Sequence, residues 1–267
     1  FSKGWAIPMA TDIAFSLAII AILGKKVPLS LKIFLAALAI VDDLGAILVI
    51  AIFYTNEIHW DYLGYSALIM ALLIILNYLN FKKHIFYLIP GFLLWFCMHH
   101  SGIHATIAGV LLAFTIPTNI SKTEMSPLEK LESKLHLPVN FLIMPLFALA
   151  NTNIMFKTGA SEALFSTLSL GIIFGLFFGK VLGINLFSFI AIKLKISKLP
   201  DKSTWKQMIG VGFLAGIGFT MSIFISLLSF KNDINIQDEA KLAILLASFL
   251  SGITGYFLLK NFSKKDI

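Results

Sequence analysis

The sequence has no arginine, one cysteine and few charged residues of either sign. All 21 of its basic residues are lysines, and charged residues make up 13% of its 267 positions. The lysines lie between apolar runs instead of in one patch, which argues against a nucleic-acid partner despite the net charge of +7. A lone cysteine, Cys97, excludes an intrachain disulfide and leaves the redox compartment open. No signal peptide is visible, and the chain opens on Phe1 and turns apolar at about Trp5, so we expect upstream sequence to be missing.

Apolar residues make up most of what is present. The chain is 58% hydrophobic with a mean hydropathy of +0.89, more than a soluble domain of this length tolerates. We therefore predict an all-α polytopic membrane protein with about nine transmembrane helices. The predicted spans are roughly Trp5–Leu23, Ile33–Tyr54, Tyr62–Asn80, Ile85–Met98, Ile103–Ile116, Leu137–Ala150, Leu164–Ile192, Met208–Phe230 and Lys241–Leu259.

The fourth and fifth of these spans are short. Pro90, His99, His100 and Gly102 are expected to break them up, so these two segments are candidates for tilted or partly re-entrant helices. The charged stretch Ser121–His136 that follows is predicted to be a connection.

The lysines are distributed unevenly between the two sides of the predicted membrane topology. Fifteen lysines lie in the connections on one side of the predicted membrane. The connections and chain end on the other side hold four, which are Lys3, Lys157, Lys231 and Lys241. Because positively charged loops stay in the cytoplasm, the C-terminus is predicted to be cytoplasmic and Phe1 to lie outside. An outside N-terminus without a signal sequence implies that an odd number of helices precedes this chain.

Two adjacent aspartates, Asp42 and Asp43, lie in the middle of the second span. The run Leu31–Val41 before them carries one charge, Lys32, and the run Leu44–Tyr54 after them carries none. One aspartate at the centre of a spanning helix costs roughly 2.5 to 3.5 kcal/mol, so a pair indicates a water-filled cavity and an ion or proton site. On a helix the two side chains point about 100° apart, so one can face a charge partner while the other faces the water path.

The first span carries another aspartate, Asp12, beside Thr11 and four residues after Pro8. Proline removes a backbone donor and threonine can satisfy a freed carbonyl, so the helix is predicted to be interrupted here. The alternative is that these residues simply cap a helix end. The eighth span offers a counterpart, with Gly216 and Gly218 before Thr220; such glycines also occur in membrane helices merely to permit close packing.

The seventh span contains Lys180 among glycines four residues apart, Gly171, Gly175, Gly179 and Gly183. The glycine ridge is predicted to let another helix come close, and the lysine to meet a carboxylate from a neighbouring helix. The alternative is a lysine that snorkels to the membrane surface. It is disfavoured because the span extends about ten residues on each side of Lys180, which is too far for the side chain to reach comfortably.

Four stretches resemble one known family. They are Gly4–Phe15 (GWAIPMATDIAF), Leu31–Ala46 (LKIFLAALAIVDDLGA), Ser101–Thr106 (SGIHAT) and Gly216–Phe224 (GIGFTMSIF). In sequence and in order they are similar to the NhaA family of bacterial sodium/proton antiporters, over nearly the whole chain. The family has twelve transmembrane helices, and this chain resembles the fourth to the twelfth.

The resemblance assigns roles to particular positions. It implies that Asp43 is the main Na+-binding carboxylate and that Asp42 pairs with Lys180 and takes part in proton exchange. It places Thr11 and Asp12 at the break of one discontinuous helix, and Gly216, Gly218 and Thr220 at the break of its crossing partner. Asp12 and Lys180 would offset the partial charges at the facing half-helix ends.

Two further positions carry a weaker implication about the response to pH. Glu132 matches a cytoplasmic acidic position of the family, and a solvated loop charge is the alternative. His104 matches the family's Ser-Gly-x-His motif. His100 and His104 could also bind a metal from one helix face, but no Cys or carboxylate lies nearby in the sequence to complete the ligand shell.

Other functions of membrane aspartates fit less well. An intramembrane prenyltransferase would hold magnesium and diphosphate on aspartates, but no second acidic cluster lies in a span. An aspartyl protease could use Asp12 and Asp43, but Lys180 would hold one of them ionised. A purely structural scaffold would not need three acids inside the membrane.

The resemblance therefore predicts a secondary active transporter, not an enzyme, that exports Na+ or Li+ in exchange for H+ in the bacterial inner membrane. The antiport is expected to be electrogenic and pH-dependent, with no cofactor and no nucleic-acid partner; the expected partners are the ions, the lipid bilayer and a second copy of the chain. Residues 1–54 and 164–267 would form an inverted-repeat transport core. Residues 55–163 would form an intervening panel of helices, a candidate surface for a homodimer.

Overall fold

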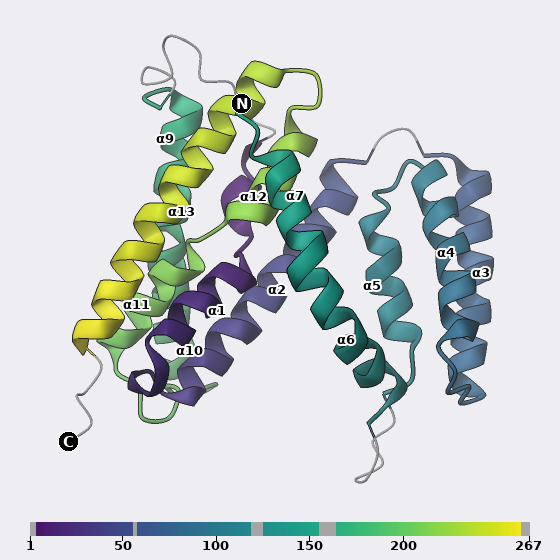
Figure 1. Ribbon diagram of the computed structural model, residues 1–267, viewed down its shortest axis with the longest axis horizontal. Helices are drawn as coiled ribbons and strands as arrows, with labels where there is room; N and C mark the ends of the chain where they lie inside the picture. Colours follow the sequence, from purple (N-terminus) through teal and green to yellow (C-terminus); the bar gives the residue numbers. More distant parts are fainter. Residues whose placement is uncertain (1–3, 56–57, 119–124, 155–163, 263–267) are drawn as a thin grey trace. The chain divides into compact units, whose positions relative to one another are not determined.

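The computed structural model describes residues 4–55, 58–118, 125–154 and 164–262, and these residues form helices and no strand (Figure 1). By packing, the chain divides into two units. Unit 1 comprises Phe1–Ala46 and Phe147–Ile267, and unit 2 comprises Ile47–Leu146. The predicted boundary between core and panel, at residues 54 and 164, stays a prediction, since packing places the division at different residues.

Unit 1 is built from helices that are mostly apolar and often interrupted. Its helices are η2 (Ile7–Met9), α1 (Ile13–Ile22), η3 (Gly24–Lys26), α2 (Leu29–Phe53, of which the part up to Ala46 belongs to this unit), α7 (Met144–Asn151, from Phe147 on), α9 (Thr167–Phe174), η5 (Gly175–Gly179), α10 (Lys180–Lys193), α11 (Trp205–Ala215), α12 (Phe219–Ser229) and α13 (Ile234–Phe262). In Figure 1, α13 (yellow) runs alongside α11 and α9, with which it makes its largest contacts.

The core of unit 1 is formed where α1, α2, α11 and α13 meet. Leu31 and Leu35 of α2 are fully buried there against Val211 and Leu214 of α11 and Leu259 of α13. Large apolar side chains also cover the outside of the unit, among them Leu182, Phe187 and Phe249. An exposed apolar surface of this kind is suited to lipid.

Unit 2 contains the C-terminal end of α2 and the helices α3 (Trp60–Tyr78), α4 (Ile85–His100), α5 (Thr106–Thr115) and α6 (Pro127–Pro138), with η4 (Val139–Ile143) after α6. Its core packs Leu73 of α3 against Tyr87 and Leu94 of α4 and Ala108 of α5. The expectation that Pro90 breaks a span is wrong, because Pro90 lies inside the continuous helix α4. His99 and His100 are the last two residues of that helix and do not interrupt it.

The predicted charged connection begins outside the described residues, at Ser121, and its described part is helical from Pro127 on. A single helical stretch runs from Pro127 to Asn151, so it begins ten residues before the predicted span. Its start is set by a capping box: the Ser126 hydroxyl accepts from the Glu129 backbone, and the Glu129 carboxylate accepts from the Ser126 backbone, with Pro127 at the first helical position. These capping residues are visible in the sequence.

Within the described ranges, five helices are long and apolar enough to cross a membrane, and the bent pair α11 and α12 would make a sixth span. Three shorter apolar segments, Ile7–Ile22, Ile85–His100 and Thr106–Thr115, lie at the remaining predicted positions. The chain is thus an all-helical membrane protein, and the count of nine spans stays a prediction.

Candidate functional site

Two interrupted helical segments contact each other at their interruptions. In the first, η2 ends at Met9, and the backbone is extended at Ala10 and again at Asp12, before α1 begins. In the second, α11 ends at Ala215 and α12 begins at Phe219, with a bend of 45° between them. The Asp12 backbone N–H donates to the carbonyl of Ile217 across a distance of 2.6 Å. The two breaks are therefore joined by their main chains.

Asp12 caps the N-termini of two helices at once. Its Oδ1 accepts from the backbone N–H of Phe15 at 3.1 Å, and its Oδ2 accepts from the backbone N–H and the hydroxyl of Thr220 at 3.1 and 2.6 Å. The carboxylate is 2% exposed and lies at the positive ends of α1 and α12. Interruption and capping, which the sequence offered as alternatives, are thus both present: Asp12 lies in the break and caps the helix after it.

The opposite, C-terminal ends of the broken helices are met by donors. Lys180 Nζ donates to the Met9 carbonyl at 2.5 Å, and the Ser16 hydroxyl donates to the Leu214 carbonyl at 2.8 Å. The Thr11 hydroxyl lies 2.8 Å from the Ala215 carbonyl. Carbonyls left over at a helix end are costly in an apolar setting unless they are satisfied, so these contacts make the breaks tolerable inside the unit.

Lys180 and Asp42 form an ion pair with 2.5 Å between Nζ and Oδ2. The Thr11 hydroxyl lies 2.8 Å from the same Oδ2 and accepts from Nζ at 3.1 Å. Because a hydroxyl has one O–H, Thr11 can donate a hydrogen bond either to Asp42 or to the Ala215 carbonyl. The side chains of Lys180 and Asp42 are 9% and 21% exposed. The snorkelling alternative does not describe this lysine, which points into the unit.

A π-helical turn, η5, comes directly before Lys180 and was not anticipated from the sequence. Turns of this kind are rare and often accompany functional positions. Of the four glycines in the predicted ridge, Gly175 alone lies close to another helix, because a Cβ there would meet Pro8 at 2.9 Å, whereas at Gly171 and Gly183 a Cβ would meet nothing within 4 Å in the described residues. The close approach is therefore made at one point and not along the whole ridge.

Asp43 differs from the other two aspartates. Its Oδ1 atom is buried and has no hydrogen-bond partner among the residues that the structure describes. Buried polar atoms are nearly always satisfied, and an exception calls for an explanation such as an ion or a water molecule. Three carboxylates, Asp12, Asp42 and Asp43, share this region with the ammonium of Lys180, so it has an excess of negative charge suited to a cation.

A cavity of about 450 Å³ reaches this cluster. Asp42 and Lys180 line it together with Leu38 of α2 and Gly179 and Ile184 from the helix of the lysine. Charged side chains on the wall of a cavity within apolar helices are a route for water and ions.

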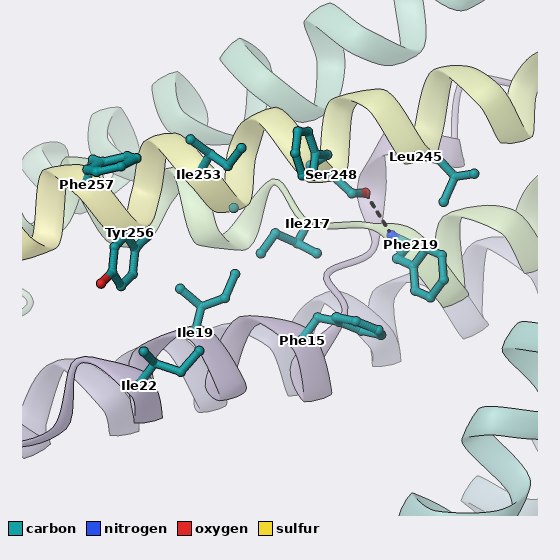
Figure 2. A pocket seen from close by; sticks show the side chains of 12 residues that line it. Phe15, Ile19, Ile22, Ile217, Phe219, Leu245, Ser248, Ile253, Tyr256 and Phe257 are labelled. Carbon is teal, nitrogen blue, oxygen red and sulfur yellow. Dashed lines mark hydrogen bonds between the residues drawn. The ribbon is translucent and has the colours of Figure 1, made fainter.

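A second cavity, of about 430 Å³, lies on another side of the broken helix α11–α12 and is apolar. In Figure 2, Ile19 and Ile22 of α1 lie across from Tyr256 of α13, Ile217 of the break lies between these two helices, and Phe15 lies beside Phe219. The rings of Phe15 and Phe219 are in edge contact at 4.9 Å. Ser248 and Tyr256 add hydroxyl groups to the lining, and the Ser248 hydroxyl accepts from the Phe219 backbone N–H at 3.2 Å. The residues that line this cavity include no charged side chain, which favours the first cavity as the route to the aspartates.

The structure brings most of the predicted site residues together and leaves two elsewhere. Asp12, Asp42, Asp43, Thr11, Lys180, Gly216, Gly218 and Thr220 all belong to unit 1. Glu132 lies on helix α6 and His104 lies just before α5, both in unit 2. Of the alternative that Glu132 is a solvated loop charge, the loop is wrong, since the residue is helical, but the residue is exposed. Among the described residues there is no group of three or more potential metal ligands around His100 and His104.

Comparison with known proteins gives consistent matches. A family model described as Na+/H+ antiporter 1 matches residues 1–259. Over 98% of its length the chain is 57% identical to the Na(+)/H(+) antiporter NhaA 2 of Flavobacterium johnsoniae, of which it covers 64%. It is 54% identical to an NhaA antiporter of Flavobacterium psychrophilum over 99% of its length, covering 68% of that protein. It is 49% identical to an NhaA antiporter of Escherichia coli over 97% of its length, covering 66% of that protein. The chain thus spans about two thirds of the length of these relatives.

Proposed function

The chain belongs to the Na+/H+ antiporter 1 family, and from this premise we propose that it exchanges Na+, or Li+, for H+ as a secondary active transporter. The proposal draws on the names of its relatives and on the cluster of charges in unit 1. A prenyltransferase is not favoured, because the matching family and the similar relatives are named Na+/H+ antiporters.

One observation carries the assignment of the cation site: the buried, unpartnered Oδ1 atom of Asp43. Na+ is a hard cation that takes oxygen ligands, and a carboxylate oxygen without a donor is available to it. Both oxygens of Asp12 and the Oδ2 atom of Asp42 already accept hydrogen bonds within the unit. Asp43 is therefore the proposed cation ligand, with Asp42 beside it.

The proposed mechanism is competition between ions at these carboxylates. A proton on Asp43 or Asp42 removes the negative charge that holds Na+, and a bound Na+ disfavours the proton. When Asp42 is protonated it no longer offers Lys180 an opposite charge, so the ion pair is weakened at that step of every cycle. Thr11 contacts both partners of the pair, and its hydroxyl can switch its single hydrogen bond between Asp42 and the Ala215 carbonyl.

The broken helices are the proposed moving parts. Asp12 links the N-termini of α1 and α12 through one carboxylate, so a shift of one half-helix is transmitted to the other. Broken helices that meet at an ion site allow alternating access from the two sides of the membrane. If more protons than Na+ cross in each cycle, the membrane potential drives Na+ export, at about 2.3 kcal/mol for each charge per 100 mV.

The proposed setting is a bacterial inner membrane with the C-terminus in the cytoplasm. Neither nucleic acid nor a resident cofactor is part of the proposal, and a homodimer through unit 2 is the proposed assembly. Glu132 and His104, in that unit, are proposed to contribute to the pH response.

Competition at Asp43 is tested by proton release. Na+ is added to the purified chain in weakly buffered alkaline detergent solution, and the pH is recorded; choline chloride is the control salt. We expect Na+ and Li+ to acidify the solution and choline not to. The same acidification in Asp43→Asn would contradict the site. Acidification in the parent but no Na+-dependent proton flux in everted vesicles would separate binding from transport.

A further inference from the structure

A basic pocket lies in the connections at one end of unit 1, apart from the aspartate cluster. The α1–α2 and α10–α11 connections enclose about 480 Å³ between them. Lys25, Lys32 and Lys202 line this pocket together with one acidic residue, Asp201. Three ammonium groups against one carboxylate give the pocket a positive charge.

The lysines of the pocket are not neutralised by nearby acids. In the part of the chain that the structure describes, ion pairs with an N–O distance of 4.0 Å or less are confined to Lys180–Asp42 and Lys241–Asp238. Lys32 Nζ donates to the backbone carbonyl of Gly24 at 2.9 Å. The positive charge is therefore available to an anion in the pocket.

Local contacts hold the two connections in place around the pocket. The Ser30 hydroxyl, on α2, donates to the backbone carbonyl of Asp201 at 2.6 Å and so ties one connection to the other. Gly24 has a φ of +60°, which glycine adopts without a steric penalty. Lys202 has a φ of +57°, an uncommon value for a residue with a side chain. The pocket is thus shaped before any ligand arrives.

The rim of the pocket continues into an apolar surface. Leu29 lines the pocket and is 71% exposed, and Ile33 follows one helical turn later with 59% exposed. In a bilayer these side chains contact acyl chains, while the lysines lie at the level of the headgroups. A ligand that satisfies both parts carries a negative charge at one end and hydrocarbon at the other.

We propose that this pocket binds the phosphate headgroup of an anionic phospholipid, whose acyl chains lie along Leu29 and Ile33. Basic pockets at the ends of membrane helices are suited to such headgroups. A free phosphate ion would use the lysines but not the apolar rim. The proposal concerns lipid binding alone and stands whether or not the chain transports sodium.

Native mass spectrometry of the delipidated protein in detergent tests this proposal. Phosphatidylglycerol and phosphatidylcholine of the same chain length are added in turn, and the bound fraction of each is measured. We expect phosphatidylglycerol to bind the parent, and the triple variant Lys25→Gln/Lys32→Gln/Lys202→Gln to bind it at least about tenfold more weakly. A matched control, Lys193→Gln/Lys195→Gln/Lys198→Gln, removes three exposed lysines that do not line the pocket, one at the end of α10 and two in the α10–α11 connection, and should weaken binding much less.

Further arms separate the pocket from general positive charge and from protein stability. The double variant Lys25→Gln/Lys202→Gln keeps the Lys32–Gly24 contact and should also lose binding, with the parent's melting temperature. Equal loss in the control triple would overturn the proposal, because charge at this end of the protein would then act without a defined site. Competition by inorganic phosphate as effective as that by a soluble, short-chain phosphatidylglycerol would overturn it too, by showing a phosphate site.

Discussion

The three membrane aspartates of unit 1 are distinguished by their partners. Asp12 receives donors on both oxygens, from Phe15 and Thr220, and Asp42 receives the ammonium of Lys180. Asp43 keeps one buried oxygen without a described donor. Three aspartates within about thirty positions of one another thus have different partners, so we expect substitutions at each to have different effects.

Asp43→Asn is expected to abolish Na+ binding while the protein still inserts and folds. The amide keeps the volume of the side chain and loses the charge that a hard cation needs. Asp42→Asn should retain measurable Na+ binding, because it disturbs mainly the pair with Lys180. Calorimetric titration of the purified variants with NaCl gives the comparison. Undiminished affinity in Asp43→Asn would show that the cation is held elsewhere.

Lys180→Ala is expected to lower the stability of the protein by roughly 3 kcal/mol, because it leaves the Asp42 carboxylate without its cation. The change also removes the donor to the Met9 carbonyl. Adding Asp42→Asn to Lys180→Ala should recover part of the loss, since the unpaired charge is then gone. Thermal unfolding in detergent measures these differences. Lys193→Ala, at the exposed end of the same helix, is the control and should change stability by no more than about 0.5 kcal/mol.

Among the helices, the packing of η5 against the first break depends on a single glycine. A Cβ at Gly175 would lie 2.9 Å from two carbon atoms of the Pro8 ring, which is closer than van der Waals contact allows. Gly175→Ala is therefore expected to destabilise unit 1 by about 1 to 3 kcal/mol through overpacking. Gly171→Ala and Gly183→Ala meet nothing within 4 Å and serve as matched controls in the same melting experiment. Equal effects at all three positions would mean that the whole ridge is packed.

The apolar helices and the two helix breaks were predictable from the sequence. The π-helical turn η5 and the continuity of α4 through Pro90 were not. Pro8 with Thr11, and Gly216 with Gly218, mark the interruptions, because proline and glycine act on the backbone directly. The π-helical η5 leaves no comparable signal, since a widened turn depends on what packs against it. The expectation about Pro90 failed for the same reason: tertiary packing maintains α4 through a residue that would break an isolated helix.

The charged cluster was the most predictable part of the molecule. Charges inside apolar runs are rare enough to stand out singly, so Asp12, Asp42, Asp43 and Lys180 could be selected without a structure. Which aspartate meets Lys180 did not follow from spacing, because adjacent residues on a helix differ only in direction; the resemblance favoured Asp42, and the structure has Lys180 beside it. The double capping by Asp12 required knowing that α1 and α12 meet.

For the molecule as a whole, the uneven distribution of lysines predicts its orientation in the membrane. The α10–α11 connection carries Lys195, Lys198 and Lys202, whereas the α12–α13 connection carries one lysine, Lys231, two residues before Asp233. Lysine-rich connections remain in the cytoplasm, so the first of these connections should be inside and the second outside. The described structure leaves both Ser197 and Asn232 exposed, one in each connection.

These two positions allow the orientation to be tested with the chain's own chemistry. In a Cys97→Ser background, which removes the single native thiol, Asn232→Cys should react with a membrane-impermeant maleimide added to spheroplasts. Ser197→Cys should react only in everted vesicles or after permeabilisation. The opposite pattern would place the lysine-rich connections outside, and the basic pocket that includes Lys202 would then face the other leaflet. Labelling of both positions in intact spheroplasts would mean that the chain does not hold one orientation.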